Sequence, residues 1–523
     1  MMTENSIYRT AVEDYRQMLT DDVSPADAEQ DLLLIINNYI REYNTGKEKN
    51  ERLQYVKVLP NAVVADIVPC FYIFKNITWT PKNGDLFVYQ TDGPNAGIYV
   101  DDDEVIDNII QQFNYKVSGM DIKDIKRMML NHAEKVQVND DRNLIPVNNG
   151  IFHFDSKTLT DFTPDIVFTT KARVDYKTDA KNVVIHNDTD DTDWDVESWM
   201  KEISDDDEIT NLLWQVVGSV IRPYERWDKA ICLYSTLGCN GKGTLCQLIK
   251  NMCGEGYYAS VPFDAFADRF GLENLLYCSA IITDENIPRG YIRDTKTLKA
   301  VITNDTFLID RKFKTCISVR FNGIMVQCIN ELPKFADKSD SLYRRLIIVP
   351  FTKSFTGAER KYIKADYVGR REVLEYVLYK VLNMNYTSFS VPQRCDAELA
   401  EYKNYNDPVR DFLNEFLDVF QWTLVPYAFL YDLYKEWFVA NTPNGQIQGK
   451  RGFINDVKMA MNCRTDWICT SASVPTRNHM NAFEPLILQY NLKDWQSHSY
   501  KGNNDIKKCE FVRKSSYIGI LKV

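Results

Sequence analysis

The residues whose types and spacing most clearly indicate chemistry lie in a small, glycine-rich turn. The turn joins an apolar strand to an amphipathic helix in the segment ICLYSTLGCNGKGTLCQLIKNM, residues 231–252. Small residues let consecutive backbone N–H groups curl around a phosphate, and the start of the helix adds its dipole. Lys242 then reaches the β- and γ-phosphates. The segment therefore predicts an ATP-binding loop, made by Gly238, Asn240, Gly241, Lys242, Gly243 and Thr244.

This loop departs from the common pattern GxxxxGK[ST] at two positions. Thr236 stands where the first glycine is expected, and Gly243 follows the lysine, with Thr244 one place later. The hydroxyl that usually binds Mg²⁺ is therefore absent or shifted by one residue, and we expect Thr244 to take its role. The alternative interpretation is a glycine-rich turn that binds no nucleotide.

Two adjacent carboxylates end a second apolar strand, 42 residues after Lys242. In LLYCSAIITDEN the strand delivers Asp284 and Glu285 at its carboxyl end, the edge at which ligands bind to an open parallel sheet. Mg²⁺ requires oxygen ligands, and the attacking water requires a base. We therefore assign Asp284 to the metal and Glu285 to the water. A surface strand that merely ends in two acids is the alternative, and the spacing behind the loop speaks against it.

Two further polar groups are associated with strands downstream. FNGIMVQCINELPKF places Asn330 at the end of a strand, where a neutral amide can hold the attacking water or the γ-phosphate without repelling it. SLYRRLIIVPF places Arg344 and Arg345 at the mouth of the next strand. An arginine supplied by another subunit can neutralise the charge that develops on a transferred phosphoryl group. The alternatives are an asparagine that caps a turn and an arginine pair in surface salt bridges.

A basic tip lies between two β-rich runs in NDTFLIDRKFKTCISVRFNG. Arg311, Lys312 and Lys314 are predicted to form the tip of a hairpin that contacts the phosphates of a threaded DNA strand. The alternative is a solvated turn that binds nothing.

The order and spacing of these motifs resemble those of superfamily 3 DNA helicases, in the phage and plasmid primase-helicase branch related to the poxvirus uncoating NTPase. The segments NGKGT, TLKAVITNDTFLIDRKFK, INELP and YRRLIIVPF carry the resemblance, which covers roughly residues 80–460. It implies an AAA+-like motor that forms a homohexamer, hydrolyses ATP and unwinds DNA at a replication fork. It also implies that one arginine of the doublet reaches the ATP of a neighbouring subunit. We expect this finger to be Arg345, supported by Arg344.

The elements that must position these residues define an α/β fold class. Short apolar strands alternate with helical stretches from about residue 208 to 352, as expected of a parallel sheet. We expect an AAA+-like P-loop motor with a parallel sheet, preceded by an α+β domain and followed by a winged-helix-like C-terminal domain. The predicted divisions are an N-terminal helical region (1–75), a pre-motor domain (76–200), the motor (201–360), a helical linker (361–405) and a DNA-binding domain (406–523).

Local signals place individual elements. Ser24 before Pro25 predicts the start of a helix, and Asn149-Gly150 predicts a hairpin turn. The segment GDLFVYQTDGPNAGIYVDDDEVIDNIIQQF predicts a hairpin followed by a helix. Its acids, Asp101 to Glu104, favour a solvated turn over a primase metal site, because no companion carboxylate or histidine follows on a strand. The acidic segment HNDTDDTDWDVESWMKEISDDDE is the best candidate for a linker.

Charge and composition exclude several classes of protein. The net charge is −11, yet from residue 441 to the end twelve Lys/Arg face six Asp/Glu, so this segment carries +6 and the remainder −17. A ring enzyme can be acidic outside and basic only where DNA passes. Twelve cysteines without a CxxC pair, and five scattered histidines, speak against a zinc site and indicate reduced cytosolic thiols. No segment predicts a signal peptide or a membrane span, so we expect a cytoplasmic location, in the bacterial host if a phage encodes the chain.

The sequence therefore predicts an ATP- and Mg²⁺-dependent helicase that acts on single-stranded and forked DNA. Other replisome proteins are further expected partners, and a membrane is not. The alternative is an origin-binding initiator, in which the basic C-terminal region reads DNA and ATP drives assembly. Asn330 and the arginine doublet speak against a P-loop kinase. DNA-stimulated ATP turnover and strand separation on a fork without an origin distinguish the first two functions.

Overall fold

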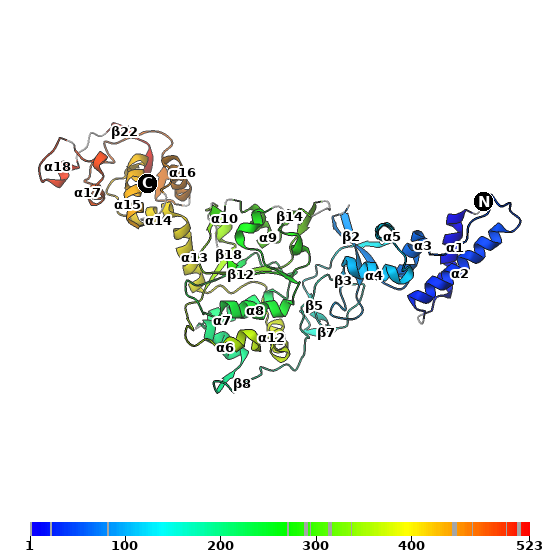
Figure 1. Cartoon of the computed structure of the whole chain (residues 1–523). Coiled ribbons are helices and arrows are strands. Elements are labelled where there is room, and N and C mark those ends of the chain that lie inside the picture. The colour runs from blue at the N-terminus through cyan, green and yellow to red at the C-terminus, as the bar shows by residue number, and fades with distance from the viewer. Residues whose placement is uncertain are drawn as a thin grey trace. The chain divides into compact units, whose positions relative to one another are not determined.

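The chain forms two compact units, Met1–Asp396 and Ala397–Val523, and the division falls inside helix α13 (Gln393–Asn406) (Figure 1). The second unit therefore begins before the predicted domain start at residue 406. The computed structural model describes the chain apart from residues 1–2, 21–22, 81–82, 205, 269–270, 287–290, 293, 312–315, 336, 442–446, 463, 498 and 510–513. The side chains of residues 80, 83, 285, 286 and 291 also lie outside the described set.

Helices open the first unit and share a core with the sheet that follows them. They are α1 (Glu4–Met18), α2 (Pro25–Asn44) and α3 (Asn61–Ile67). The Ser24 hydroxyl accepts a hydrogen bond from the Asp27 N–H at the start of α2, which confirms the predicted cap. Buried residues of these helices, such as Leu32 and Ile36, belong to the same apolar cluster as Phe74 of the first strand. The N-terminal helices are therefore packed against the following elements.

The first sheet has the spatial order β3-β2-β1-β4. Its elements are β1 (Phe74–Thr80), β2 (Asn83–Tyr89), β3 (Tyr99–Val100) and β4 (Glu134–Val136), with α4 (Asp103–Phe113) and α5 (Gly119–His132). The antiparallel pair β2–β3 followed by α4 confirms the predicted hairpin and helix. The Asp102 carboxylate accepts hydrogen bonds from the N–H groups of Glu104 and Val105 and so caps α4. Asp103 pairs with Lys126, so these acids have structural partners.

Two hairpins connect this sheet to the centre of the unit. The first confirms the Asn149-Gly150 turn, with β5 (Leu144–Val147) antiparallel to β6 (Gly150–His153) and β7 (Thr158–Thr160) beside it. The second, β8 (Ile185–Asn187) and β9 (Thr192–Trp194), lies in the segment predicted to be a linker and leads into α6 (Val196–Ser204). The linker prediction is wrong, because Trp194, Trp199 and Met200 are buried in the central core despite the acidic residues around them.

A five-stranded parallel sheet forms the centre of the first unit, as predicted. In spatial order its strands are β11 (Tyr258–Ala259), β12 (Ala280–Asn286), β16 (Ile324–Ile329), β10 (Ala230–Tyr234) and β18 (Leu346–Pro350). Packed helices, which Figure 1 draws on one side of the sheet, are α7 (Asp207–Ser219), α8 (Lys242–Cys253) and α12 (Arg371–Asn383). All residues of β16 and β18 are buried, as expected of strands covered on both faces.

The connection from β12 to β18 contains the elements that surround the predicted DNA hairpin. They are β13 (Tyr291–Ile292), α9 (Lys296–Ile302), β14 (Thr306–Ile309), β15 (Ile317–Arg320), β17 (Lys334–Phe335) and α10 (Asp340–Tyr343). β14 and β15 pair antiparallel, as the two β-rich runs predicted. β15 also contacts β1 of the first sheet. After β18, α11 (Lys361–Ala365) and α12 form the helical stretch expected after residue 353.

The second unit has its own aromatic core and a small antiparallel sheet of order β19-β23-β20. In chain order its elements are α14 (Pro408–Phe416), β19 (Leu424–Pro426), α15 (Tyr427–Asn441), α16 (Lys450–Met461), β20 (Trp467–Cys469), β21 (Val474–Pro475), α17 (Leu486–Gln489), α18 (Asp505–Lys508), β22 (Ser516–Tyr517) and β23 (Gly519–Lys522). Phe412 of α14 packs edge to face on Tyr434 and Trp437 of α15 and on Phe453 of α16. These ring contacts hold the three helices together.

In the part of the chain that the structure describes, no helix combines the length and the apolar character that a bilayer crossing requires.

Candidate nucleotide site

The predicted phosphate loop occupies residues 235–241, between the end of β10 and the start of α8. Cys239 and Gly241 have φ angles of 52° and 88°, so the loop curls through left-handed conformations. A Cβ on Gly241 would lie 2.8 Å from the Ile203 side chain, so both space and backbone favour glycine there. Asn240 closes the turn: its Nδ2 donates to the Leu237 carbonyl at 2.6 Å, and its Oδ1 accepts from the Lys242 N–H at 3.3 Å.

The Lys242 side chain lies inside this turn. It is buried, and its Nζ donates to the Ser235 carbonyl at 3.4 Å. Burial lowers the pKa of Lys242. A buried ammonium with one long hydrogen bond gains from an anionic partner, and a phosphate in the loop is such a partner.

Asp284 lies beside the start of α8, as the spacing of the motifs predicts. The register between β12 and β16 shifts after Thr283, so Asp284 and Glu285 form a bulge opposite Cys328. The Asp284 carboxylate lies 3.4 Å from Lys250 Nζ and 3.8 Å from Lys364 Nζ. Glu285 belongs to β12, and its side chain is outside the described set.

Gly243, rather than Thr244, faces Asp284. A Cβ on Gly243 would lie 3.5 Å from Asp284 Oδ1 and 3.2 Å from Lys364 Nζ. Thr244 points about 100° further around α8 and lines a different space, the cleft described below. The shifted hydroxyl that was predicted as a Mg²⁺ ligand is therefore turned away from the carboxylate with which it was expected to work.

Asn330 and the arginine doublet lie at opposite edges of the central sheet. Asn330 directly follows β16, whose last carbonyl accepts from the Ser235 N–H at 3.2 Å, so it lies at the edge that carries the loop. Arg344 and Arg345 precede β18, and the Arg345 carbonyl accepts from the N–H of Ala230, the first residue of β10. The length of β10 separates these two edges by about 13 Å. The doublet is therefore at the amino end of the strands, away from the loop of its own chain.

The two arginines differ in exposure. Arg344 is exposed, and its backbone carbonyl accepts a hydrogen bond from Lys229 Nζ. Arg345 is half-buried, and its guanidinium donates to the carbonyl and the hydroxyl of Ser341, on the preceding helix α10. Arg344 is thus the arginine of the pair whose side chain is turned to solvent.

A cleft opens next to the loop. Gly241 and Thr244 line one end of it. Its apolar walls come from α6 and from the segment after β18: Trp199, Ile203, Phe355 and Ile363. The backbone of Phe355 donates to the Cys239 carbonyl at 2.7 Å, which fixes this wall to the loop. The sequence motifs gave no sign of this cleft, because its walls are ordinary apolar residues from distant segments.

Arg311, which was predicted to contact DNA, is not exposed at the tip of a hairpin. Its guanidinium is buried and donates to the Asp85 carboxylate of β2 at 2.6 Å. Trp79 Nε1 donates to the same carboxylate at 2.9 Å. The prediction that Arg311 forms part of an exposed basic tip is therefore wrong, because Asp85 engages it against the first sheet. Lys312 and Lys314 lie outside the described residues.

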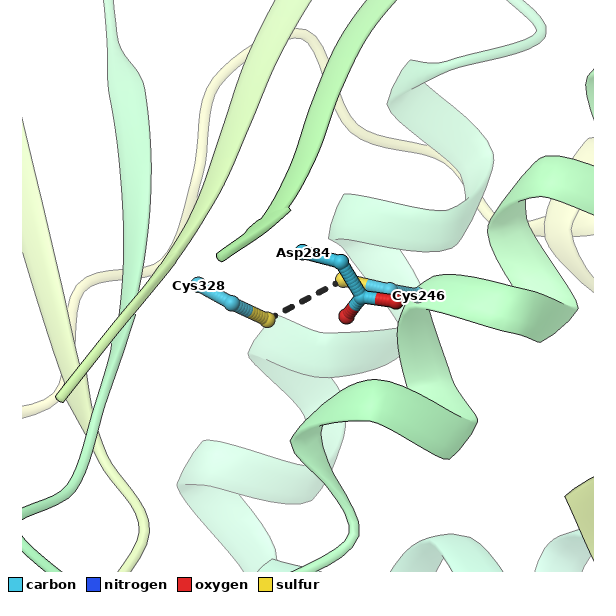
Figure 2. A group of neighbouring side chains, drawn as sticks. All are labelled: Cys246, Asp284 and Cys328. Carbon is cyan, nitrogen blue, oxygen red and sulfur yellow. Dashed lines mark hydrogen bonds between the residues drawn. The ribbon is translucent and has the colours of Figure 1, made fainter. Parts of the chain in front are cut away.

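Two cysteines that carried no signal in the sequence lie next to Asp284. Cys246 of α8 and Cys328 of β16 are buried, with their sulfur atoms 3.2 Å apart, and the Asp284 carboxylate points toward them (Figure 2). The contact with Cys328, together with burial, raises the pKa of the Cys246 thiol well above its usual value. Sequence spacing cannot reveal this cluster, because its members are far apart in the chain and come from three elements.

Three family models match successive parts of the chain. Residues 99–206 match the family described as D5 N terminal like, and residues 404–496 match the family described as Poxvirus D5 protein-like. Residues 233–345, which contain the loop and the arginine doublet, match a family of unknown function (DUF5906). Among curated proteins, none matches the chain.

Solved structures of the NrS-1 C-terminal region are similar at low identity. One apo structure is 13% identical, with a TM-score of 0.41, over 88% of this chain and 99% of that chain. A second is 12% identical, with a TM-score of 0.39, over 76% of this chain and 86% of that chain. At these TM-scores the likeness does not establish a common fold.

The two D5-related matches lie on either side of the nucleotide loop in the sequence and are consistent with a replication-related NTPase or helicase. Both matches confirm the resemblance to the poxvirus-related branch that the motifs predicted.

Proposed function

We propose that this protein is an ATP-dependent DNA helicase of superfamily 3, which works as a homohexameric ring in phage- or plasmid-type replication. The observation that carries the proposal is the distribution of groups on the central sheet. Lys242, Asp284 and Asn330 gather at the carboxyl edge, while Arg344 lies exposed at the other edge. A parallel sheet with an inner loop-bearing strand supports an AAA+-like P-loop motor.

ATP fits the space beside the loop. Its phosphates would lie against the loop backbone, the first turn of α8 and Lys242. The cleft between α6 and the segment after β18 continues from Gly241 and Thr244, and its apolar walls suit a nucleobase. Mg²⁺ would be held by Asp284 and the phosphates, and Glu285 would orient the attacking water.

The position of the arginines supports the proposed ring. A nucleotide in the loop has no arginine of the doublet near it, because the doublet is about 13 Å away along β10. Arg344 is exposed and can reach the nucleotide of another copy. An arginine that acts on a neighbour's phosphates requires an assembly in which loop edges and arginine edges meet.

The second unit supplies a surface suited to duplex DNA. In its three-stranded sheet, β19 lies between α14 and α15 in the chain, and β20 and β23 follow α16. This arrangement supports a winged-helix-like domain with α16 as the second helix of the pair. Phe453, Val457 and Met461 bury one face of α16. Arg451 and Lys458, on the other face, are exposed, and Asn455 lies between them. Arginine and asparagine are the residues that most often read guanine and adenine in the major groove. This face favours the second candidate function, an origin-binding initiator, as an additional activity.

The test is ATP turnover and strand separation on a forked duplex that carries no origin sequence. A helicase should hydrolyse ATP faster when the fork is present and should release the displaced strand. If the rate of ATP hydrolysis is the same with and without forked DNA, and no strand is released, the helicase proposal is wrong and the initiator function remains.

Replacing the proposed base should separate binding from chemistry. Glu285→Gln should bind ATP normally and lose about 10²–10⁴-fold in turnover, because the Mg²⁺ ligand remains and the base is lost. Asp284→Asn should instead raise the Mg²⁺ requirement. Nucleotide affinity by fluorescence titration and single-turnover hydrolysis distinguish the two. If Asp284→Asn affects turnover alone and Glu285→Gln affects binding, the two roles are exchanged.

Restoring the missing hydroxyl should strengthen metal binding. Gly243→Ser would place an oxygen beside Asp284, and only the flexible end of Lys364 must move to make room. We expect the Mg²⁺ concentration for half-maximal turnover to fall about fivefold, equivalent to about 1 kcal/mol. Gly243→Ala is the matched control, because it fills the same space without an oxygen. An equal effect in both variants would show that the hydroxyl does not reach the metal.

The α16 face should determine duplex affinity. Arg451→Ala should weaken binding to a preferred duplex by about 1–3 kcal/mol, and Lys458→Ala should reduce the salt slope by about 1. Lys507→Ala is the control, because it removes an exposed lysine from α18, which lies at the other side of the same unit (Figure 1). Fluorescence anisotropy across a salt series measures both quantities. If all three variants lost the same duplex affinity, α16 would contribute only non-specific electrostatic attraction.

A further inference from the structure

Three side chains with metal-binding atoms converge beneath the nucleotide loop. The Cys246 and Cys328 sulfurs and an Asp284 carboxylate oxygen all lie within 4.8 Å of one another (Figure 2). The residues belong to α8, β12 and β16, three elements that the core of the sheet holds in place. Such a cluster does not depend on a loop and is present in the folded chain without a ligand.

The donor set selects among metals. Mg²⁺ and Ca²⁺ take oxygen ligands and would use Asp284 alone. Zn²⁺ accepts thiolate and carboxylate together in a tetrahedral arrangement, with Zn–S bonds of about 2.3 Å, which places two sulfurs about 3.8 Å apart. The observed separation of 3.2 Å therefore needs to widen by about 0.6 Å, within the reach of small side-chain rotations.

We propose that Cys246, Asp284 and Cys328 form a binding site for Zn²⁺ or another thiophilic divalent cation. Binding converts both thiols to thiolates and releases two protons, with no change of oxidation state. The ion with two thiolates and one carboxylate has a net charge of −1. Lys250 and Lys364, 3.4 Å and 3.8 Å from Asp284, compensate this charge. The fourth ligand position remains for water or a phosphate oxygen.

Occupancy of this site should interfere with the nucleotide reaction. Asp284 is the residue that we assign to Mg²⁺, and this part of the inference rests on the proposed function. A carboxylate held by Zn²⁺ cannot also orient Mg²⁺ on the phosphates. Traces of a thiophilic metal would thus inhibit ATP turnover by occupying this site.

Cobalt is the direct probe, because thiolate-bound Co²⁺ has an intense charge-transfer absorption and Zn²⁺ displaces it. The reduced, full-length chain should bind one equivalent with this band. Cys246→Ala and Cys328→Ala should each lose the band. Cys253→Ala should keep it, because it removes another buried thiol of α8 whose neighbour is Ser279. Absence of the band in the parent, or its persistence in Cys246→Ala and Cys328→Ala, overturns the site. The parent spectrum decides alone if a variant fails to fold.

Turnover supplies the second readout. Zn²⁺ should inhibit the parent and Cys253→Ala reversibly, and a chelator should restore both. Cys246→Ala and Cys328→Ala should resist the same Zn²⁺ concentration. A cobalt band without inhibition would overturn the competition with Mg²⁺. A cobalt band in a chain that never hydrolyses ATP would instead refute the proposed function and leave the metal site standing.

Discussion

Arg344→Ala should bind ATP as the parent does and lose about 10³–10⁵-fold in turnover. The guanidinium is exposed at the amino edge of the sheet, so its removal disturbs no packing. The substitution also removes the cation that a neighbouring copy needs when negative charge develops on the transferred phosphoryl group. Equilibrium nucleotide binding and steady-state hydrolysis on the same preparation measure the two effects separately.

Mixing variants tests whether the arginine acts between subunits. Arg344→Ala combined with Lys242→Ala should regain part of the activity, because some interfaces then pair an intact loop with an intact arginine. The motifs predicted Arg345 as the finger, whereas its guanidinium is hydrogen-bonded to Ser341 of the preceding helix of the same chain. We now expect Arg345→Ala to act by loosening the turn before β18 and to show a lower melting temperature. If subunits mix and no activity returns for either arginine variant, the site is completed within one chain.

Lys242→Ala should reduce ATP hydrolysis to the background rate measured without protein, while the fold stays intact. The lysine is buried with one hydrogen bond of 3.4 Å, and burial lowers its pKa, so alanine removes a desolvated charge together with a buried alkyl chain. These two effects on stability oppose each other, and the melting temperature should therefore change little. Lys296→Ala, on the exposed face of α9, is the control and should keep full turnover. Hydrolysis by Lys242→Ala near the parent rate would remove the phosphate-loop assignment.

The features that could be predicted from the sequence are those with local physical causes. The Ser24 cap, the Asn149-Gly150 turn and the parallel sheet follow from hydrogen-bonding and hydrophobic patterns within short segments. Asp284 and Asn330 were placed at one sheet edge because both follow buried strands, and parallel strands bring their carboxyl ends together.

The features that were missed depend on contacts between distant segments. The sequence pattern predicts that Arg311 is part of a basic turn, and only the folded structure brings Asp85 next to it. The acidic segment around β8 and β9 reads as a linker, yet Trp194 anchors it in the core. The cluster of Cys246, Asp284 and Cys328 carries no signal in the sequence, since cysteine spacing reveals only ligands that lie in pairs along one segment. Cys246 and Cys328 meet across a helix and a strand.

The loop and Arg344 lie at opposite ends of the parallel strands, so each copy has two different contact surfaces. We call the loop edge the head and the Arg344 edge the tail. Copies that join head to tail cannot form a two-fold symmetric pair, because the two contacting surfaces differ. An open row of such copies always has one unmatched head and one unmatched tail, so a pair holds a single complete site. Only closure of the row completes every site. The activity per subunit should therefore increase with protein concentration and level off once the row has closed.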